Sequence, residues 1–365
     1  MKALYIQAND FERLAAAFQR LKLEEKVQSV LFFMANKDQF SAAVLTPLLK
    51  DFPKKIIGGI FPELIFEGER KPSGVLLICL EQTLNCHRFN LGENRARFFS
   101  ILEERFSDFG ADASSLFIFC DVLGKYNTLF LESLYNFFGI NLRYLGGLAG
   151  SEEFKAFPCI LDNEGLHENA AVIGLSTVRM QLGAAHGWSA ISEPLKVTAS
   201  SDNRIKTLNW EPAFSLYQKI IKEQEKRPVQ ADRLWEVAQF HPLGIARMDE
   251  ERILRDLVRI EGTDILLVNP IHQGEHVCVM SANKEDLLIG AKKAYDLSSK
   301  KKESTEVFCV NCISRVSFLQ KDFAKELEII KTKGRVNGIL SMGEIASRGY
   351  AMPEIFNKTI VVAQW

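Results

Sequence analysis

One sequence pattern occurs three times along the chain and limits the folds available to it. Each copy has an apolar strand, a helix, a second strand that carries glycine, and a hairpin that leads into a third apolar strand. The strands are expected at 30–33, 56–60 and 75–78, at 116–120, 144–149 and 171–174, and at 307–310, 336–339 and 359–362. A repeated unit predicts a pseudo-symmetric architecture. Because paired glycines weaken strands, they also indicate that the backbone approaches a neighbour closely there.

The length and the order of the elements predict two domains. A chain of 365 residues has room for about two. Residues 159–207 change from the repeat to short strands and turns. Residues 222–231 are polar and contain Pro228, which favours a boundary. We therefore expect an α+β fold of two domains, 1–225 and 226–365, in which helices cover mixed β-sheets built from the repeated β-α-β-hairpin units.

The composition argues against several classes of partner. Apolar residues make up 47% of the chain and the formal net charge is −1. The chain can therefore bury a large core, but it has no overall field that attracts nucleic acid or acidic membranes. It contains no apolar run long enough to span a bilayer and no secretory leader at its start. Its seven cysteines, an odd number, suit reduced thiols. We expect a cytoplasmic protein with no nucleic-acid or membrane partner.

Two motifs with metal-site spacing are better explained by ordinary structure. His272 and His276 match the pattern H-x-x-E-H, which needs a helix to bring both rings to one face, whereas Gly274 favours a turn. Cys309 and Cys312 have C-x-x-C spacing, but their flanks read as a strand, in which residues three apart point to opposite faces. An enzyme that uses either pair is kept as an alternative.

Two other segments could contribute to a ligand site. His186 and Trp188 flank a glycine, which suits either a structural turn or the rim of a pocket. Arg315 lies just past a buried strand and opposite the glycine-bearing strands, where its guanidinium could bind a carboxylate with two hydrogen bonds. No residues assemble a nucleophile, a base and an orienting group. The sequence therefore does not predict an enzyme.

Several short segments occur in the order found in the FIST family, and the chain resembles a protein with FIST N and FIST C sensory domains. The segments are residues 58–60, 144–150, 185–188, 197–198, 241–245, 312–315, 338–345 and 356–359. They cover nearly the whole chain from about Val30. The chain departs from the family pattern at Phe356, where His is frequent, and at Ser314, where Gly is favoured. The strand 58–63 is also more apolar than usual.

The resemblance implies a bacterial sensor without enzymatic activity. FIST domains are thought to bind small molecules, with amino acids proposed, and to pass the signal to a histidine kinase, a diguanylate cyclase or a chemoreceptor. Some relatives bind haem and respond to nitric oxide, so a haem sensor with His186 as axial ligand is an alternative. Otherwise no cofactor is expected. A scaffold that has lost its pocket is a further alternative.

The expected ligand site combines residues of the third copy with two glycines and an aromatic segment. Arg315 is expected to bind a carboxylate, and Glu344 to pair with an ammonium group or with Arg315. Asn357 would supply a neutral hydrogen bond. The site is expected between the domains or against the glycine-bearing strands, where absent side chains leave room. The remaining candidate residues are Cys312, Trp188, His186, Gly146 and Gly147.

Overall fold

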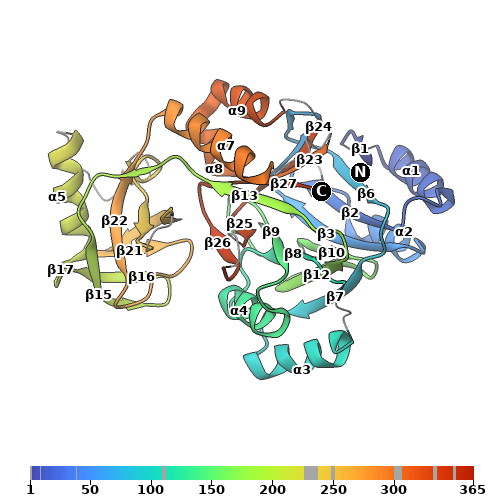
Figure 1. Cartoon of the computed structure of the whole chain (residues 1–365), viewed down its shortest axis with the longest axis horizontal. Helices are drawn as coiled ribbons and strands as arrows, with labels where there is room; N and C mark the ends of the chain where they lie inside the picture. The colour runs from blue at the N-terminus through green and yellow to red at the C-terminus, as the bar shows by residue number, and fades with distance from the viewer. Residues whose placement is uncertain are drawn as a thin grey trace.

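The computed structural model describes residues 2–8, 10–37, 39–108, 112–225, 237–247, 251–299, 306–331, 335–347 and 351–365. Within these residues the repeated pattern forms three units with one order of elements: strand, helix, strand, helix, strand, hairpin, strand. Figure 1 shows the helices of the three units on the outside of the sheets, with α1 and α2, α3 and α4, and α7 to α9 on three different sides. The predicted α+β class is confirmed.

The first two units are continuous in sequence. The first contains β1 (Lys2–Ile6), α1 (Phe11–Leu23), β2 (Ser29–Ala35), α2 (Ala42–Lys50), β3 (Lys55–Phe61), the hairpin β4 (Glu63–Phe66) and β5 (Glu69–Lys71), and β6 (Val75–Leu80). The second contains β7 (Asn85–Asn90), α3 (Arg95–Phe106), β8 (Ser115–Asp121), α4 (Asn127–Phe138), β9 (Arg143–Ala149), the hairpin β10 (Ile160–Asp162) and β11 (Gly165–His167), and β12 (Ala170–Ser176).

The third unit is interrupted by an inserted domain. It begins with β13 (Gln181–Ala185) and resumes with α7 (Lys284–Ser298), β23 (Glu306–Cys312), α8 (Ile313–Leu319), a 3-10 turn (Gln320–Asp322) and α9 (Phe323–Ile330). It ends with β24 (Arg335–Ser341), the hairpin β25 (Glu344–Ala346) and β26 (Glu354–Phe356), and β27 (Ile360–Gln364). The start of α7 follows from its sequence, because Asn283 and Asp286 form a capping box.

Each unit lends its hairpin to the sheet of another unit. The sheet of the first unit has the order β1-β6-β2-β3 and continues into β10-β11 of the second. The sheet of the second, β7-β12-β8-β9, continues into β25-β26 of the third, and the sheet of the third, β13-β27-β23-β24, continues into β4-β5 of the first. The exchange closes a ring of three units, so the predicted pseudo-symmetry is confirmed.

One glycine occupies the same place in every unit. Gly58, Gly146 and Gly338 are each the fourth residue of the strand that pairs in parallel with β2, β8 or β23. A Cβ at these positions would lie 1.8, 1.6 and 1.9 Å from a carbonyl oxygen of the neighbouring strand. The close approach that the glycine-bearing strands predict is therefore an approach to protein backbone.

Phenylalanine rings fill the space where the three units meet. Phe33 of β2 lies 5.1 Å from Phe119 of β8 and 5.7 Å from Phe308 of β23, measured between ring centroids. Phe61 contacts both Phe33 and Phe119, and all four side chains are buried. Truncating such a buried ring to alanine costs about 3–5 kcal/mol. The apolar strands of the repeat thus form one shared core.

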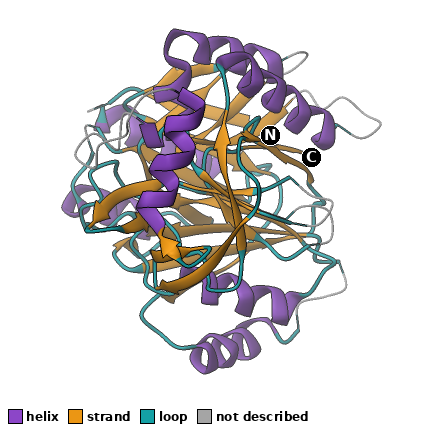
Figure 2. Cartoon of the chain, turned by 90° about the vertical axis from the view of Figure 1, so that its left-hand side faces the viewer, coloured by secondary structure: helices purple, strands orange, loops and turns teal. Residues whose placement is uncertain are grey.

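The inserted domain projects from one side of the ring in Figure 1 and faces the viewer in Figure 2. It contains β14 (Ser189–Ala190), β15 (Leu195–Ser201), β16 (Arg204–Leu208), β17 (Glu211–Pro212), α5 (Ala213–Glu225), β18 (Leu243–Ile245), β19 (Ile253–Arg255), β20 (Leu257–Glu261), β21 (Asp264–Leu267) and β22 (His276–Ser281). Its sheet has the order β19-β18-β22-β15-β16-β21-β20, and α5 contacts β16, β17 and β21.

The boundary expected at residue 225 falls at the end of α5. Strands before it pair with strands after it in three sheets, since β9 pairs with β25, β13 with β27 and β15 with β22. Pro228, which suggested the boundary, lies outside the described residues. The division at 225 therefore stays a prediction. Across the described parts of the chain, no helix combines the length and the apolar character needed to cross a membrane.

Candidate ligand site between the third unit and the inserted domain

The candidate site lies where the carboxyl ends of the parallel strands β23 and β24 meet the inserted domain. Cys312 ends β23 and pairs with Ser341 at the end of β24. In sheets with parallel strands, ligands bind beyond these carboxyl ends. Lys358, which precedes Thr359 and β27, lies at the same place. Its side chain contacts Trp188 and Asp256, which come from the inserted part of the chain. We call this place the junction.

An ion pair between a buried lysine and a partly exposed aspartate crosses the junction. The Lys358 ammonium group lies 2.8 Å from a carboxylate oxygen of Asp256, and only 3% of the Lys358 side chain is exposed. The same ammonium group lies 5.7 Å from the centroid of the Trp188 ring, within the range of a cation–π contact. A buried ammonium group is unfavourable unless a counter-charge accompanies it, so Asp256 is needed where Lys358 is charged. Lys358 has a φ of 54°, in the left-handed region, so the backbone turns sharply at this residue.

Arg315 is buried in α8 and bound entirely by protein groups. Its Nε and Nη2 donate to the carboxylate of Glu326, which is also fully buried. Its Nη1 donates to the carbonyls of His186 at 2.7 Å and Lys358 at 3.0 Å, and Nη2 donates to the carbonyl of Leu287 at 2.9 Å. Arg315 therefore forms its ion pair with Glu326 and not with Glu344, although Arg315 was one of the two partners expected for Glu344. Because these acceptors use the whole guanidinium group, a ligand carboxylate would have to displace one of them.

Glu344 opens β25 and holds a proton at neutral pH. Its two carboxyl oxygens accept from the Ser341 hydroxyl at 2.7 Å and from the Thr359 backbone N–H at 3.2 Å. Burial raises the pKa of Glu344 to about 8, and these hydrogen bonds oppose the shift only in part. A neutral carboxyl group can accept and donate hydrogen bonds but cannot balance a ligand ammonium group as a charge.

The cysteines of β23 are thiols rather than thiolates. Cys312 lies with its sulfur 3.1 Å from the Ser314 hydroxyl, and burial raises the pKa of its thiol. Burial likewise raises the pKa of Cys309. A buried thiol with a raised pKa is a poor nucleophile and a poor metal ligand. Of the described residues, no group of three or more His, Cys, Asp and Glu could hold a metal ion.

Two buried polar atoms near Lys358 have no hydrogen-bond partner among the residues that the structure describes. They are the indole N–H of Trp188, whose side chain is 4% exposed, and the amide oxygen of Asn357, which is 1% exposed. Buried polar groups are bonded in the great majority of cases, so such atoms indicate where a ligand or a bound water completes the structure. Both residues were expected in the site from the sequence.

The other expected residues have structural contacts. His186 accepts the Trp188 backbone N–H at Nδ1, 2.8 Å, and its Nε2 lies 3.0 Å from the Arg252 carbonyl. Both ring nitrogens of His186 are therefore engaged by backbone in this conformation. Gly146 packs against a carbonyl of β8, and Gly147 lies opposite Glu344 in the β9–β25 pairing. The glycines thus support the strand that carries Glu344.

Sequence reasoning missed three charged residues at the junction. Lys358 lies inside the segment 356–359 that resembles the family but was given no role. A lysine placed directly before a buried apolar strand is the signal that could have found it. Asp256 and Glu326 carry no such signal, because only the fold brings them to Lys358 and Arg315.

The pattern of H-x-x-E-H is a turn, as expected. His272 lies in the loop before β22 and His276 is the first residue of that strand. The Glu275 carboxylate accepts from the His272 backbone N–H at 2.7 Å. This arrangement gives no support to metal hydrolysis.

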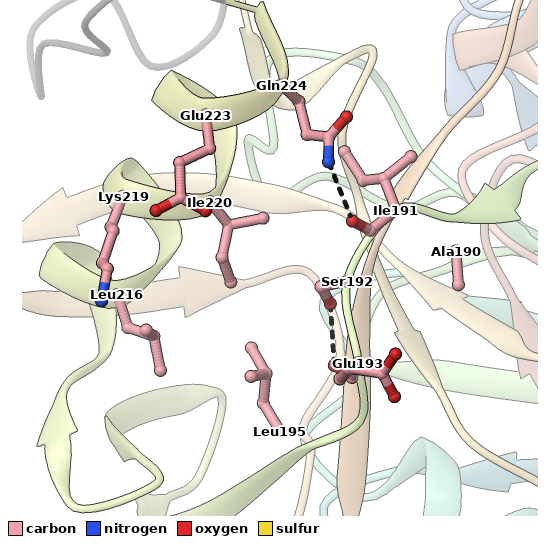
Figure 3. Close-up of a pocket in the computed structure, with 10 residues that line it drawn as sticks. All are labelled: Ala190, Ile191, Ser192, Glu193, Leu195, Leu216, Lys219, Ile220, Glu223 and Gln224. Atoms are coloured by element: carbon pink, nitrogen blue, oxygen red, sulfur yellow. Dashed lines mark hydrogen bonds between the residues drawn. The ribbon is translucent and has the colours of Figure 1, made fainter.

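A separate groove lies on the inserted domain. It has a volume of about 570 Å³ and runs between α5 and the segment 190–195 (Figure 3). Figure 3 shows Ile220 and Leu195 on opposite walls, and Gln224 donating to the Ile191 carbonyl at 3.4 Å at one end. None of the residues expected in the ligand site lines this groove. The groove and the junction are therefore different places.

Family models match most of the chain: the FIST N domain matches residues 28–211 and the FIST C domain matches residues 213–347. The chain belongs to the FIST family, whose domains are sensory domains associated with signalling. A search of curated proteins finds no match. Asn357 and Lys358 lie beyond the FIST C match, in the last part of the third unit.

Proposed function

We propose that this FIST protein binds a small zwitterion, of which an amino acid is the simplest, at the junction. The observation that carries the proposal is the pair of the buried Lys358 and Asp256, next to Trp188 and Asn357, each of which has a buried polar atom without a partner among the described residues. A further proposal is that the bound state is read by a partner protein in the cytoplasm, such as a histidine kinase, a diguanylate cyclase or a chemoreceptor.

An amino acid carries the same two charges as this ion pair. The ligand carboxylate can form an ion pair with the ammonium group of Lys358 and accept a hydrogen bond from the indole N–H of Trp188. The ligand ammonium group can form an ion pair with the carboxylate of Asp256 and donate a hydrogen bond to the side-chain amide oxygen of Asn357. Each buried charge keeps a counter-charge throughout, so the exchange avoids the large cost of an unpaired buried ion. It also satisfies two polar atoms, which adds about 1–3 kcal/mol for each.

Other expected residues have supporting roles in this proposal. Arg315 binds the carbonyls of His186 and Lys358, and so positions the backbone on both sides of Trp188. Cys312 and the neutral Glu344 lie next to Thr359 and make up the polar wall behind Lys358. We assign the ligand carboxylate to Lys358 rather than to Arg315 because Arg315 has a full set of acceptors. No observation at His186 favours the haem alternative.

Ligand binding at the junction is suited to signalling because the ion pair joins two bodies. Lys358 belongs to the third unit, and Asp256 follows β19 in the inserted domain. When a ligand separates the two charges, a direct contact between the bodies is replaced by one through the ligand. A change in the relative position of the inserted domain is the form of signal that a partner protein could detect.

Calorimetry with a panel of amino acids tests the proposal. Wild type should bind at least one member in a saturable 1:1 reaction, and Asp256→Asn should weaken that binding about tenfold or more, because a charge-assisted bond to the ligand is lost. The matched control is Asp322→Asn, which removes a carboxylate that also lies 2.8 Å from a lysine, Lys284, on the other side of α7. Unchanged affinity in Asp256→Asn, or an equal loss in Asp322→Asn, would sink the proposal.

A further inference from the structure

We propose that a second site, in a cleft between the first and second units, binds a small phosphate-type anion. The cleft has a volume of about 250 Å³. It is lined by the start of β3, the middle of β7, the turn between β10 and β11, and β12. The residues that matter to the argument are Lys55, Arg88, Asp162 and Glu164. The site is independent of the junction, because none of its residues belongs to the third unit or the inserted domain.

The aspartate of the cleft is already neutralised. One oxygen of Asp162 lies 3.0 Å from Nη1 of Arg88, and the other lies 2.8 Å from Nε2 of His167. These contacts hold the exchanged hairpin β10–β11 against β7 of its own unit. Because both carboxylate oxygens are occupied, Asp162 does not offer its charge to a ligand.

Two cationic groups of the cleft have capacity left. The ammonium group of Lys55 makes no ion pair or hydrogen bond with the residues that the structure describes. Arg88 uses Nη1 for Asp162 and His167, and its Nε and Nη2 make no hydrogen bond within the same described part. An ammonium group and the free edge of a guanidinium group are the donors with which proteins bind phosphate oxygens.

The remaining carboxylate does not cancel this charge. Glu164 is 66% exposed in its side chain, and its carboxylate lies 3.6 Å from the ammonium group of Lys50 outside the cleft. Asp162 is paired with Arg88 and Glu164 with Lys50, so Lys55 is the cation of the lining that has no carboxylate partner among the described residues. An unpaired ammonium group beside the free edge of the Arg88 guanidinium favours an anion over a cation.

A neighbouring histidine senses the same positive field. Burial lowers the pKa of His87, and the charges of Arg105 and Arg88 lower it further. His87 precedes Arg88 on β7, also lines the cleft, and packs against Phe89 and Phe106. An anion bound to Arg88 would offset part of the field, so the pKa of His87 reports on binding in the cleft.

The cleft has room for a small anion. It is open to solvent and has a volume of about 250 Å³. This is enough for inorganic phosphate or a short phosphorylated compound. Two cationic side chains from different strands also match the several oxygens of a tetrahedral anion better than the single plane of a monocarboxylate.

The test is a titration with inorganic phosphate at constant ionic strength, followed by calorimetry and by the proton resonances of His87. Wild type should show saturable binding and a rise in the pKa of His87. Lys55→Gln should weaken binding about five- to tenfold. Lys206→Gln, which removes an exposed lysine of the inserted domain, should bind as wild type does and so controls for net charge.

Three outcomes would overturn the proposal. They are binding that does not saturate, equal affinity in wild type and Lys55→Gln, and a pKa of His87 that phosphate leaves unchanged. Titration with malonate under the same conditions tests the class of anion. Malonate that binds as tightly as phosphate would overturn the assignment to the phosphate class.

Discussion

Replacing Arg315 with methionine should cost this protein a large part of its stability, although the residue was expected to bind ligand. The substitution leaves the fully buried carboxylate of Glu326 without its cation. Removing one partner of a buried pair costs about 3–5 kcal/mol. Three backbone carbonyls, of His186, Leu287 and Lys358, also lose a donor. We therefore expect a loss of about 4 kcal/mol or more, which is a large share of the roughly 5–15 kcal/mol of a typical protein.

Urea unfolding at pH 7, followed by circular dichroism, measures this loss. The double variant Arg315→Met with Glu326→Leu should recover about 2 kcal/mol or more, because it no longer buries an unpaired carboxylate. The control Arg259→Met removes an arginine whose side chain is 65% exposed and should cost no more than about 1 kcal/mol. A single Arg315→Met variant within about 1 kcal/mol of wild type would refute the reasoning, as would a double variant no more stable than the single one.

Two further predictions concern the repeat and the buried carboxyl group. Gly146→Ala should lower the free energy of unfolding by about 3 kcal/mol or more, because the added Cβ would lie 1.6 Å from the Ile118 carbonyl oxygen. Gly147→Ala should cost less, because its Cβ would meet only side chains, the nearest at 3.2 Å. Equal losses of stability in thermal or urea unfolding would contradict this. The pKa of Glu344 is raised to about 8, so the folded state keeps a proton that the unfolded chain begins to lose above its ordinary pKa of 4.5. Wild type should therefore lose up to about 1.4 kcal/mol per pH unit between about pH 5 and pH 8 relative to Glu344→Gln, and a pH-independent difference in unfolding free energy would argue against it.

Much of the fold could be predicted because the repeat has a local pattern. Apolar strands such as 116–120, and a glycine at the same place in each copy, are properties of short segments. The exchange of hairpins could not be predicted. The residues of β4, Glu63–Phe66, do not show that they pair with β24, some 270 residues later, because pairing between distant strands depends on the packing of the whole ring.

The candidate site could be predicted only as a set of residues. In the structure Glu344 and Asn357 belong to the third unit, and Trp188 lies just before β14. The sequence named all three as ligand-binding residues, and that role stays a prediction. It could not show that Arg315 faces Glu326, since that carboxylate comes from a different helix. Nor could it show that Lys358 is buried, because burial depends on the inserted domain that supplies Asp256.

The most direct test of the central claim is the indole N–H resonance of Trp188 in a proton–nitrogen NMR spectrum. This N–H is buried and has no partner in the described part of the chain, whereas Trp210 is 77% exposed and serves as an internal control. Addition of a bound amino acid should move the Trp188 resonance and slow its exchange with water, while the Trp210 resonance stays in place. A ligand that binds with 1:1 stoichiometry and leaves Trp188 unchanged would contradict a site at the junction.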